Sequence, residues 1–249
     1  MTAVAPEFSD GVRAYYVRNV ADFRKALRII KALLENLAED ESLFIDNIEV
    51  RLKSVESLID KCILKRVSPE DIDTGIRDIA GARIIVKYLD MIPIVVEKLR
   101  ALNGLVIRGS KDYLANPKEN GYKGYHLYTE VIVGGNIPVP VEIQIRTMGQ
   151  DLWASIEHEL RYKPACTEEC TKNMNEEEKR IFEETKKEEE DKRNEAFRLI
   201  SEKLSEIDSE VIKLRKSCEP VKSFVKISSN VNKASANSEI PAALEAIKP

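Results

Sequence analysis

The chain has 249 residues, enough for one large domain or two small ones, and 43% of them are hydrophobic, which is sufficient for a buried core. Charged residues make up 33%, but the formal net charge is only −4, so the chain lacks the global positive field of a non-specific nucleic-acid binder and we expect no DNA partner. No apolar run approaches the roughly 20 residues that span a bilayer, and no signal segment opens the sequence, so we expect a cytoplasmic protein without a membrane partner.

The cysteines and histidines limit the metal chemistry that the chain could support. Cys166 and Cys170 are close enough to suggest a metal pair, but no second pair among the four cysteines has the spacing of a zinc site. The whole chain has two histidines, so we expect ordinary reduced thiols. A phosphohydrolase domain that binds its metal through several histidines is excluded for the same reason.

The N-terminal third predicts a helix, a strand and a second helix. Residues 1–19 show no periodic pattern, and we expect a lead-in there. Apolar residues then recur at helical spacing and predict an amphipathic helix over 20–38. A strand is predicted over 44–53, and Ser54 is expected to cap the helix that follows.

A cationic ridge is expected on that second helix. Lys53, Ser57 and Lys61 fall at i, i+4 and i+8, and Arg51 lies close by on the strand. A basic surface helix is the plain alternative. It is weakened because no acidic residues alternate with the basic ones, as they usually do on a solvated stripe.

Strand and helix signals alternate in the middle of the chain, which favours an α/β fold. After a turn at 71–77, the signals are a buried strand around 84–86, a helix over 92–102, strands over 105–113 and 125–133, and a strand over 139–146. The last two strands are separated by a Gly-Gly-Asn turn, which predicts an antiparallel hairpin. The 116–124 loop is rich in turn formers, lysine and tyrosine; it could stack a base and meet phosphate, or be a plain surface loop.

Polar residues alternate with apolar ones along the strand over 139–146. Successive side chains of a strand point to opposite faces, so Glu142, Gln144 and Arg146 share one face. An ordinary solvated strand face would also be polar. The charges of the flanking segments weaken that alternative.

The composition changes after residue 163. Residues 166–218 predict a helical extension, first rich in Glu and Lys and then carrying a narrow apolar seam at spacings of 3 and 4: Phe197, Ile200, Leu204, Ile207, Val211 and Leu214. The seam could pack on the domain or on another subunit. Residues 219–249 have the composition of a disordered tail.

Two carboxylates lie at strand positions where they could hold Mg²⁺. Asp78 and Glu142 would serve if their strands are neighbours, since magnesium commonly takes one or two carboxylates together with substrate phosphates. Five cations could clamp a nucleoside triphosphate: Arg51, Lys53, Lys61, Arg83 and Lys111. No P-loop or Rossmann glycine pattern is present. Chemistry alone therefore indicates a magnesium-dependent nucleotide enzyme and goes no further.

Five blocks in order resemble one family. They are Arg51-x-Lys53-Ser54-x-Glu56-Ser57-x3-Lys61, Arg77-Asp78-x-Ala80-Gly81-x-Arg83, Lys111-Asp112-Tyr113, Pro117-Lys118-Glu119-Asn120-Gly121-Tyr122-x2-Tyr125-His126, and Val141-Glu142-Ile143-Gln144-Ile145-Arg146-Thr147 followed by Trp153-x2-Ile156-Glu157-His158. Over residues 20–165 the chain is similar to the synthetase domain of RelA/SpoT-type alarmone synthetases, in the stand-alone form called small alarmone synthetases.

The resemblance implies a nucleotidyltransferase-like α/β (α+β) fold, with a mixed sheet of about five strands flanked by helices. It implies transfer of the β,γ-diphosphate of ATP to the 3′-hydroxyl of GDP or GTP, which yields (p)ppGpp and AMP. By the same resemblance, ATP binds to Arg51, Lys53, Ser57, Lys61 and Arg83, and the acceptor nucleotide to Lys111, Tyr113, Asn120, Tyr122, His126, Gln144 and Arg146. The implied catalytic residues are Glu142, Asp78 and Arg83, with Mg²⁺ on Asp78 and Glu142.

Individual roles also follow from the resemblance. Tyr122 would stack on guanine, and Glu142 would help to deprotonate the acceptor hydroxyl. His126 would either line the acceptor side or act as a structural hydrogen-bonding group, and His158 is expected to be structural. The seam fits the family's habit of forming homo-oligomers, in particular tetramers. RNA as a regulator has no support in these residues.

The chain departs from the family pattern in two respects. Lys123-Gly124 stands where a larger or hydroxyl residue is expected, and the hydrolase half and regulatory C-terminal domains of long synthetases have no counterpart. We therefore expect neither hydrolysis nor ribosome sensing. The alternatives are the same chemistry on an adenine nucleotide or an RNA 3′ end, and a catalytically inactive interaction module of the same fold.

Overall fold

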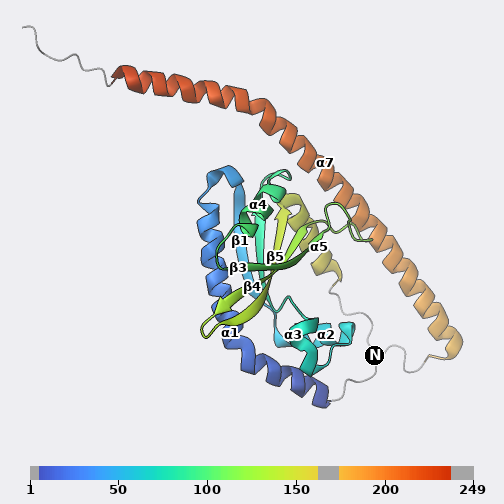
Figure 1. The fold of residues 1–249 in the computed structure, drawn as a ribbon. Coiled ribbons are helices and arrows are strands. Elements are labelled where there is room, and N and C mark those ends of the chain that lie inside the picture. Colours follow the sequence, from blue (N-terminus) through green and yellow to red (C-terminus); the bar gives the residue numbers. More distant parts are fainter. Residues whose placement is uncertain (1–5, 162–173, 237–249) are drawn as a thin grey trace, which may run out of the picture. The chain divides into compact units, whose positions relative to one another are not determined.

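The computed structural model describes residues 6–161 and 174–236. The chain divides into two compact units, Met1–Asp208 and Ser209–Pro249. The first unit contains a sheet with helices against it (Figure 1). Within the described residues, no helix has the length and apolar character that a membrane crossing requires.

The sheet has five strands in the order β1-β2-β5-β4-β3. Their bounds are β1 Ile45–Leu52, β2 Ala80–Val86, β3 Leu105–Asp112, β4 Tyr125–Val133 and β5 Ile137–Thr147. The pair β2–β5 is parallel and the other three pairs are antiparallel, so the sheet is mixed, as predicted. The predicted hairpin of β4 and β5 is confirmed; Gly135 and Asn136 in its turn have φ of 79° and 60°.

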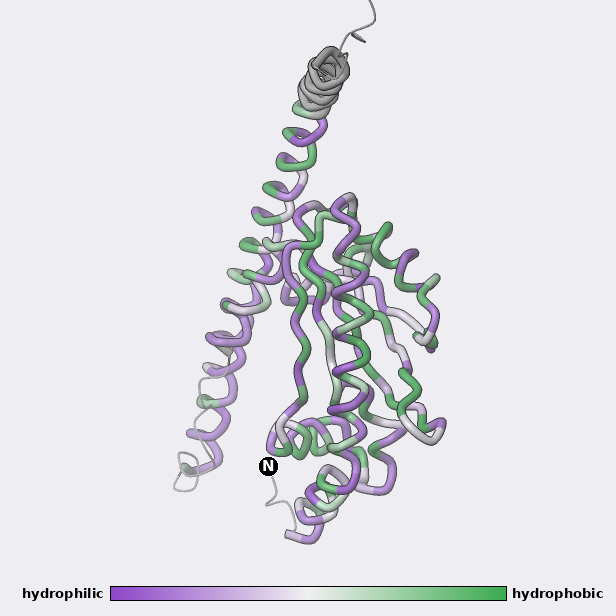
Figure 2. The backbone as a smooth tube through the Cα atoms, turned by 90° about the vertical axis from the view of Figure 1, so that its left-hand side faces the viewer, coloured by the Kyte–Doolittle hydropathy of each residue, from purple (hydrophilic) through white to green (hydrophobic). Residues whose placement is uncertain are grey.

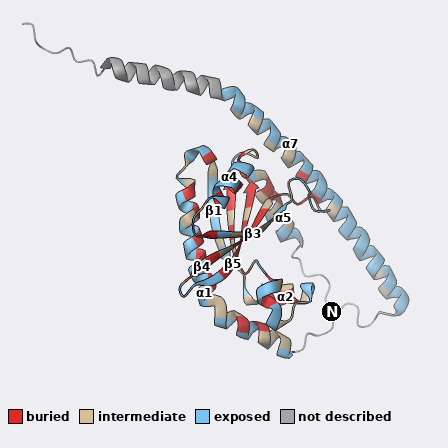
Figure 3. Ribbon diagram, in the orientation of Figure 1, coloured by how far each residue is buried: buried red, intermediate tan, exposed pale blue. Residues whose placement is uncertain are grey.

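The helices of the described residues are α1 Pro6–Ala38, α2 Val55–Lys65, α3 Ile72–Gly75, α4 Met91–Arg100, α5 Met148–Arg161 and α7 Glu176–Ala236, with short 3₁₀ turns at Glu41–Leu43 and Pro69–Asp71. Of these, α1, α4 and α5 contact the strands of the sheet. α1 and α4 share one hydrophobic core with the apolar side of the strands, so they cover that face of the sheet. Figure 3 shows the buried residues concentrated in the strands.

The alternation predicted for β5 is confirmed. Val141, Ile143 and Ile145 are fully buried in the main core. Glu142 and Arg146, on the opposite face, are only 9% and 5% exposed. This polar face is therefore not an ordinary solvated surface, because buried charges persist only where they are paired or used.

The helices extend further toward both ends of the chain than the sequence pattern indicated. The predicted lead-in at 1–19 is helical from Pro6, since α1 begins there and buries Val12 and Tyr15. The Tyr15 hydroxyl hydrogen-bonds to Asp73, which anchors this part of α1 to α3. The predicted tail at 219–249 is helical as far as Ala236, because an established helix gains one backbone hydrogen bond for each residue added. Residues 237–249 lie outside the described residues.

The described part of the C-terminal extension contains one long helix, α7. The Glu- and Lys-rich beginning of α7 is almost entirely hydrophilic in Figure 2, in agreement with the predicted solvated segment. The compact unit includes α7 as far as Asp208, which lies beyond the predicted domain end at residue 165. Cys62 and Cys218 are free thiols, as expected, and Cys166 and Cys170 lie outside the described residues.

Candidate active site

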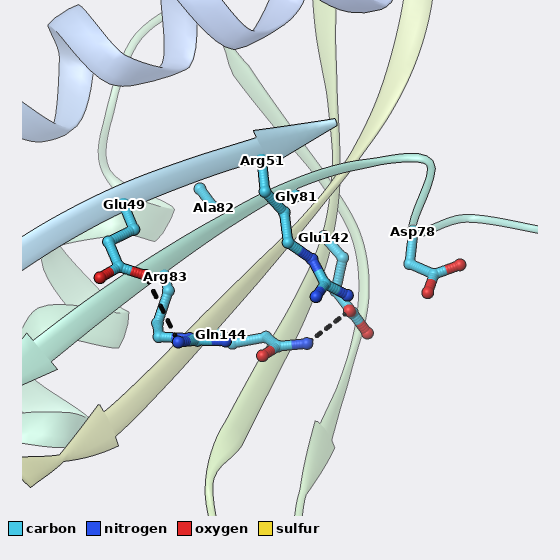
Figure 4. Close-up of a pocket in the computed structure, with 8 residues that line it drawn as sticks. All are labelled: Glu49, Arg51, Asp78, Gly81, Ala82, Arg83, Glu142 and Gln144. Atoms are coloured by element: carbon cyan, nitrogen blue, oxygen red, sulfur yellow. Dashed lines mark hydrogen bonds and ion pairs between the residues drawn. The ribbon is translucent and has the colours of Figure 1, made fainter. Parts of the chain in front are cut away.

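The two predicted carboxylates come together because their strands are neighbours. Asp78 lies just before β2, and Glu142 on β5 pairs with Gly81 in the parallel β2–β5 register. Both side chains line the same small cavity with Arg51 and Arg83 (Figure 4). In Figure 4 the Arg51 side chain extends over Gly81 toward Glu142, and no side chain at residue 81 separates them.

The predicted cationic ridge is directed at Asp78. Lys53 Nζ lies 3.2 Å from Asp78 Oδ2, and Lys61 donates a hydrogen bond to the same oxygen. Ser54 caps α2 by accepting from the backbone N–H of Ser57, as predicted. The cap sets the start of the helix, and Lys61 follows about two turns after Ser54, so it lies on the same side of the helix as the cap residue.

Charge pairing holds Asp78 ionised. Burial alone would raise the pKa of Asp78, but the hydrogen bond from Lys61 and the charges of Lys53 and Lys61 outweigh it and lower the pKa. Burial, together with the Lys61 charge, lowers the pKa of Lys53. Oδ1 of Asp78 is buried and has no hydrogen-bond partner, so this carboxylate retains one unused ligand atom.

A closed set of hydrogen bonds orients Glu142. Its Oε1 accepts from Nδ1 of His126 at 3.0 Å, and its Oε2 accepts from Nε2 of Gln144 at 2.8 Å. Nδ1 carries the proton because a carboxylate only accepts, so Nε2 of a neutral ring accepts from the Tyr122 hydroxyl at 2.5 Å. Arg146 donates both to that hydroxyl, at 2.8 Å, and to Gln144 Oε1, at 2.7 Å.

His126 has the features of both sequence interpretations. The residue is 7% exposed and its ring donates to Glu142, as a structural hydrogen-bonding group would, and it also lines the larger cavity. Burial raises the pKa of Glu142, but the hydrogen bonds from His126 and Gln144 act against it, and the net pKa is lowered. Glu142 is therefore ionised at neutral pH.

Two larger cavities adjoin the small one. A cavity of about 350 Å³ shares Arg51, Arg83 and Gln144 with it, and one of about 270 Å³ shares Asp78 and Glu142. The small cavity itself holds about 30 Å³, the space of about one water molecule. The carboxylates and arginines thus form a floor that joins two openings, each near the size of a small-molecule pocket.

The predicted residue sets are distributed over both openings. The larger cavity is lined by Arg51 and Arg83 of the predicted ATP set and by Asn120, Tyr122, His126, Gln144 and Arg146 of the predicted acceptor set. Lys61 and Lys111 line the other cavity with Lys65 and Arg77. Ser57 is exposed at the start of α2, and Tyr113 packs edge-on against Tyr122 and His126. His158, expected to be structural, lies exposed on the rim of the larger cavity.

Tyr122 is more enclosed than a free stacking surface. Its ring is 7% exposed and packs at an angle to Trp153, with a centroid distance of 5.9 Å. The ammonium of Lys118 lies 4.7 Å from the ring centroid and the Arg146 guanidinium carbon lies 5.1 Å from it. Stacking of a base on this ring would therefore require a covering side chain, such as the exposed Lys118, to move aside.

Sequence reasoning missed Asp151, an acidic residue that pairs with both Arg83 and Arg146. Asp151 Oδ1 lies 3.1 Å from Arg83 NH1 and 3.2 Å from Arg146 NH1. It is the fifth residue after Arg146 across the junction of β5 and α5, a separation that no strand or helix periodicity marks. Burial and the charge of Arg146 lower the pKa of Arg83, so a bound anion would stabilise this pair of cations.

Comparisons with known proteins agree with this geometry. The sequence profile described as "Region found in RelA / SpoT proteins" matches residues 50–167. The GTP pyrophosphokinase YjbM of Bacillus subtilis is 39% identical over 151 residues, which are 59% of this chain and 70% of that protein. The GTP pyrophosphokinase YwaC of the same organism is 40% identical over 126 residues, 48% of this chain and 59% of that protein.

A solved structure covers still more of the chain. The small alarmone synthetase 1 from Bacillus subtilis matches with a TM-score of 0.66 and 31% identity, over 82% of this chain and 98% of that one. The same protein bound to its product pppGpp matches with a TM-score of 0.67 and 29% identity. The chain belongs to the small alarmone synthetase family. The family resemblance stated from the five sequence blocks is thus confirmed.

The departure of this small alarmone synthetase from the expected pattern at residues 123–124 has a local reason. Gly124 has φ of +154°, and a Cβ there would lie 3.2 Å from the Tyr122 hydroxyl and 3.3 Å from Arg146 Cγ. The glycine therefore leaves room for the hydrogen bond between those two side chains. Lys123 is directed toward α7, where its Nζ donates to the Ser205 hydroxyl at 2.7 Å.

The carboxylates of this small alarmone synthetase fit a magnesium ion. The buried, unpartnered Oδ1 of Asp78 and the ionised Glu142 provide oxygen ligands at one cavity. Among the described residues, no group of three or more His, Cys, Asp and Glu side chains could hold a metal ion. A site completed by substrate phosphates is the arrangement that two carboxylates favour.

Proposed function

We propose that this protein is a (p)ppGpp synthetase that transfers the β,γ-diphosphate of ATP to the 3′-hydroxyl of GDP or GTP. The main support is a single arrangement: two carboxylates at the junction of two cavities, one of them bound by Lys53 and Lys61, with Arg51 and Arg83 beside them. Phosphoryl-type transfer depends on positioning and charge neutralisation, which such an arrangement supplies. The names of the relatives, GTP pyrophosphokinase, support the same reaction.

In this proposal ATP binds along Arg51, Lys53, Ser57, Lys61 and Arg83. Lys53 and Lys61 neutralise Asp78 in the unliganded protein, so both are already oriented toward the point where phosphate oxygens would arrive. Guanidinium groups stack on aromatic rings and also bind phosphate, which suits Arg51 and Arg83 to an adenine nucleotide. Mg²⁺ on Asp78 and Glu142 would neutralise the diphosphate charge.

The acceptor binds in the larger cavity in this proposal, with guanine on the Tyr122 ring. Its predicted contacts are Lys111, Tyr113, Asn120, Tyr122, His126, Gln144 and Arg146, of which Lys111 lines the other cavity beside Lys61. The 3′-oxygen attacks the β-phosphorus, the bond between that phosphorus and the bridging oxygen of the α-phosphate breaks, and AMP leaves. Glu142 accepts the proton of the 3′-hydroxyl. It has a free lone pair on each oxygen beside the bonds from His126 and Gln144.

We also propose that the enzyme acts in the cytoplasm as a homo-oligomer, in particular a tetramer. The predicted seam supports this in part. Phe197 is buried within the unit, whereas Ile200 and Ile207 are 41% and 56% exposed on the same helix. Exposed isoleucines seven residues apart repeat on one helix face, which is the pattern of a helix–helix contact.

The test is product analysis with the purified protein. The protein is incubated with Mg²⁺, ATP labelled in the β- and γ-phosphates, and one acceptor at a time: GDP, GTP, GMP or ADP. The products are resolved by chromatography. We expect AMP together with an equal amount of a guanosine 3′-diphosphate product from GDP or GTP. Label transfer to ADP alone, or no transfer to any of these acceptors, would overturn the proposal.

A further inference from the structure

A region of α7 packs on the loop that carries Asn120 and Tyr122. The 116–124 loop has three hydrogen bonds of its own: Lys118 N–H donates to the Tyr122 carbonyl at 3.2 Å, Gly121 N–H donates to the Lys118 carbonyl at 2.8 Å, and Tyr122 N–H donates to Asn120 Oδ1 at 3.2 Å. Asn120 Nδ2 also donates to Glu157 of α5 at 3.2 Å. The internal bonds shape the loop, but its position on the domain depends on the elements that pack against it. Ordering it at the moment of nucleotide binding would cost affinity.

Two serines of α7 hold this loop from outside. The Ser201 hydroxyl, on a residue 5% exposed, donates to the Gly121 carbonyl at 2.6 Å. Lys123 Nζ donates to the Ser205 hydroxyl at 2.7 Å. The two serines are four residues apart and therefore lie on one side of the helix.

The close approach of helix and loop requires a glycine. Gly121 has φ of +87°, a conformation that L side chains rarely adopt, and a Cβ there would lie 2.9 Å from Arg198 Cα and 3.0 Å from Ser201 Cβ. The Arg198 contact is with helix backbone, which cannot move aside as a flexible side chain could. The loop and the helix are therefore fitted to each other at atomic contact.

The same part of α7 is fixed independently to α5 and the end of β5. Trp153 Nε1 donates to the Phe197 carbonyl at 2.8 Å, and the Phe197 side chain is 3% exposed against the indole. Thr147 Oγ1 donates to Asp208 Oδ2 at 2.7 Å. The helix thus connects the rigid end of the sheet to the loop, with anchors on either side of Ser201 and Ser205.

We propose that residues 197–208 of α7 are a positioning element of the active site, and that Ser201 and Ser205 set the conformation of the 116–124 loop for the acceptor nucleotide. The proposal rests on the acceptor role assigned above to Asn120 and Tyr122. A helix that served packing alone would present apolar side chains to the loop, whereas this one presents a buried hydroxyl and a second hydroxyl to polar loop atoms. ATP contacts on β1 and α2 lie outside this region.

The test compares the full-length wild type with the double variant Ser201→Ala, Ser205→Ala. A matched control, Glu202→Ala with Glu206→Ala, has the same spacing on the exposed side of the same helix. Initial rates are measured against acceptor concentration at saturating ATP, and against ATP at saturating acceptor. Hydrogen exchange of the unliganded proteins is measured over residues 116–124 and over β4.

We expect the acceptor KM of the double serine variant to rise roughly 4- to 140-fold, since each of the two lost hydrogen bonds contributes a factor of about 2 to 12. The ATP KM and kcat should stay within about twofold. Exchange should quicken in the 116–124 loop and not in β4. A variant with unchanged acceptor KM, or with both KM values raised alike, overturns the proposal even if exchange quickens. If the wild type forms no guanosine product, the proposed function fails, and unchanged loop exchange would then refute the positioning role by itself.

Discussion

Replacing Glu142 by glutamine separates the charge of this side chain from its shape. Both carboxylate oxygens accept hydrogen bonds, from His126 at 3.0 Å and from Gln144 at 2.8 Å. In the Glu142→Gln variant an amide NH₂ group replaces one of these two oxygens, so one hydrogen bond is lost because two donors then face each other. A hydrogen bond to a charged group contributes about 1.5–3 kcal/mol, and part of its loss is offset because no buried charge remains. We expect a net destabilisation of about 1–2 kcal/mol, which lowers the unfolding midpoint by about 2–8 °C for a unit of this size.

The effect on turnover should be much larger than the effect on folding. Removal of a group that stabilises developing charge costs about 10²–10³ in kcat, equivalent to roughly 3–4 kcal/mol, while ground-state binding changes little. We therefore expect kcat to fall by that factor and both KM values to stay within about threefold. AMP formation followed by chromatography, with thermal unfolding in parallel, measures both quantities.

A control makes the same chemical change on the same face of the sheet. Glu130 on β4 is paired with Arg108 at 2.6 Å and is absent from the linings of the cavities that contain Asp78 and Glu142. Glu130→Gln should retain near wild-type kcat. If Glu142→Gln retained a rate within about threefold of the wild type, the catalytic role assigned to Glu142 would be wrong.

Three other predictions concern the surroundings of the floor. Lys61→Met should raise the ATP KM and also raise the pKa of Asp78. A carboxylate whose pKa is lowered by folding stabilises the protein above its unfolded-state pKa, and this stability is lost as the pH falls through its folded-state pKa, so the variant should unfold at a higher pH than the wild type in acid titrations followed by circular dichroism. Acid transitions at the same pH in both proteins would contradict the pairing of Lys61 with Asp78. Tyr122→Leu should weaken acceptor binding by about 1–3 kcal/mol relative to Tyr122→Phe, since both lose the hydroxyl bond from Arg146 and the phenylalanine alone keeps a stacking face; equal acceptor KM values would remove the stacking role. Gly121→Ala should lower the unfolding midpoint by several degrees, because a Cβ meets helix backbone at a positive φ, and a midpoint equal to wild type in calorimetry would show that the contact is relaxed.

Local patterns predicted the sheet and the composition of its polar face well. The period-two alternation of β5 placed Glu142, Gln144 and Arg146 on one side, and helical spacing after the Ser54 cap placed Lys61 on the cationic ridge. Both predictions depend on residues close in sequence, where strand and helix geometry fix the side-chain direction. Neighbouring strands then follow from the few topologies that an α/β pattern allows.

The sequence failed where partners come from distant segments. The sequence analysis missed the early part of α1 although Val12 and Tyr15 have helical spacing, because the apolar pattern is interrupted before Phe23. The hydrogen-bond partner of Tyr15, Asp73, also lies far along the chain. The enclosure of Tyr122 and the contact of Ser201 with Gly121 depend on the packing of α7, which no local periodicity specifies. The sequence also left open whether the seam packs on the domain or on another subunit; in the structure Phe197 is buried within the unit and Ile200 is 41% exposed.

The fit between Gly121 and α7 has a consequence for how this chain could be recombined with its relatives. The profile match ends at residue 167, yet the helix that the loop accommodates lies at residues 197–208. A chimera whose crossover falls between these segments would join the loop of one parent to the helix of another and lose their mutual fit. The loop and this stretch of α7 therefore form a single unit of exchange, although more than 70 residues separate Gly121 from Ser201.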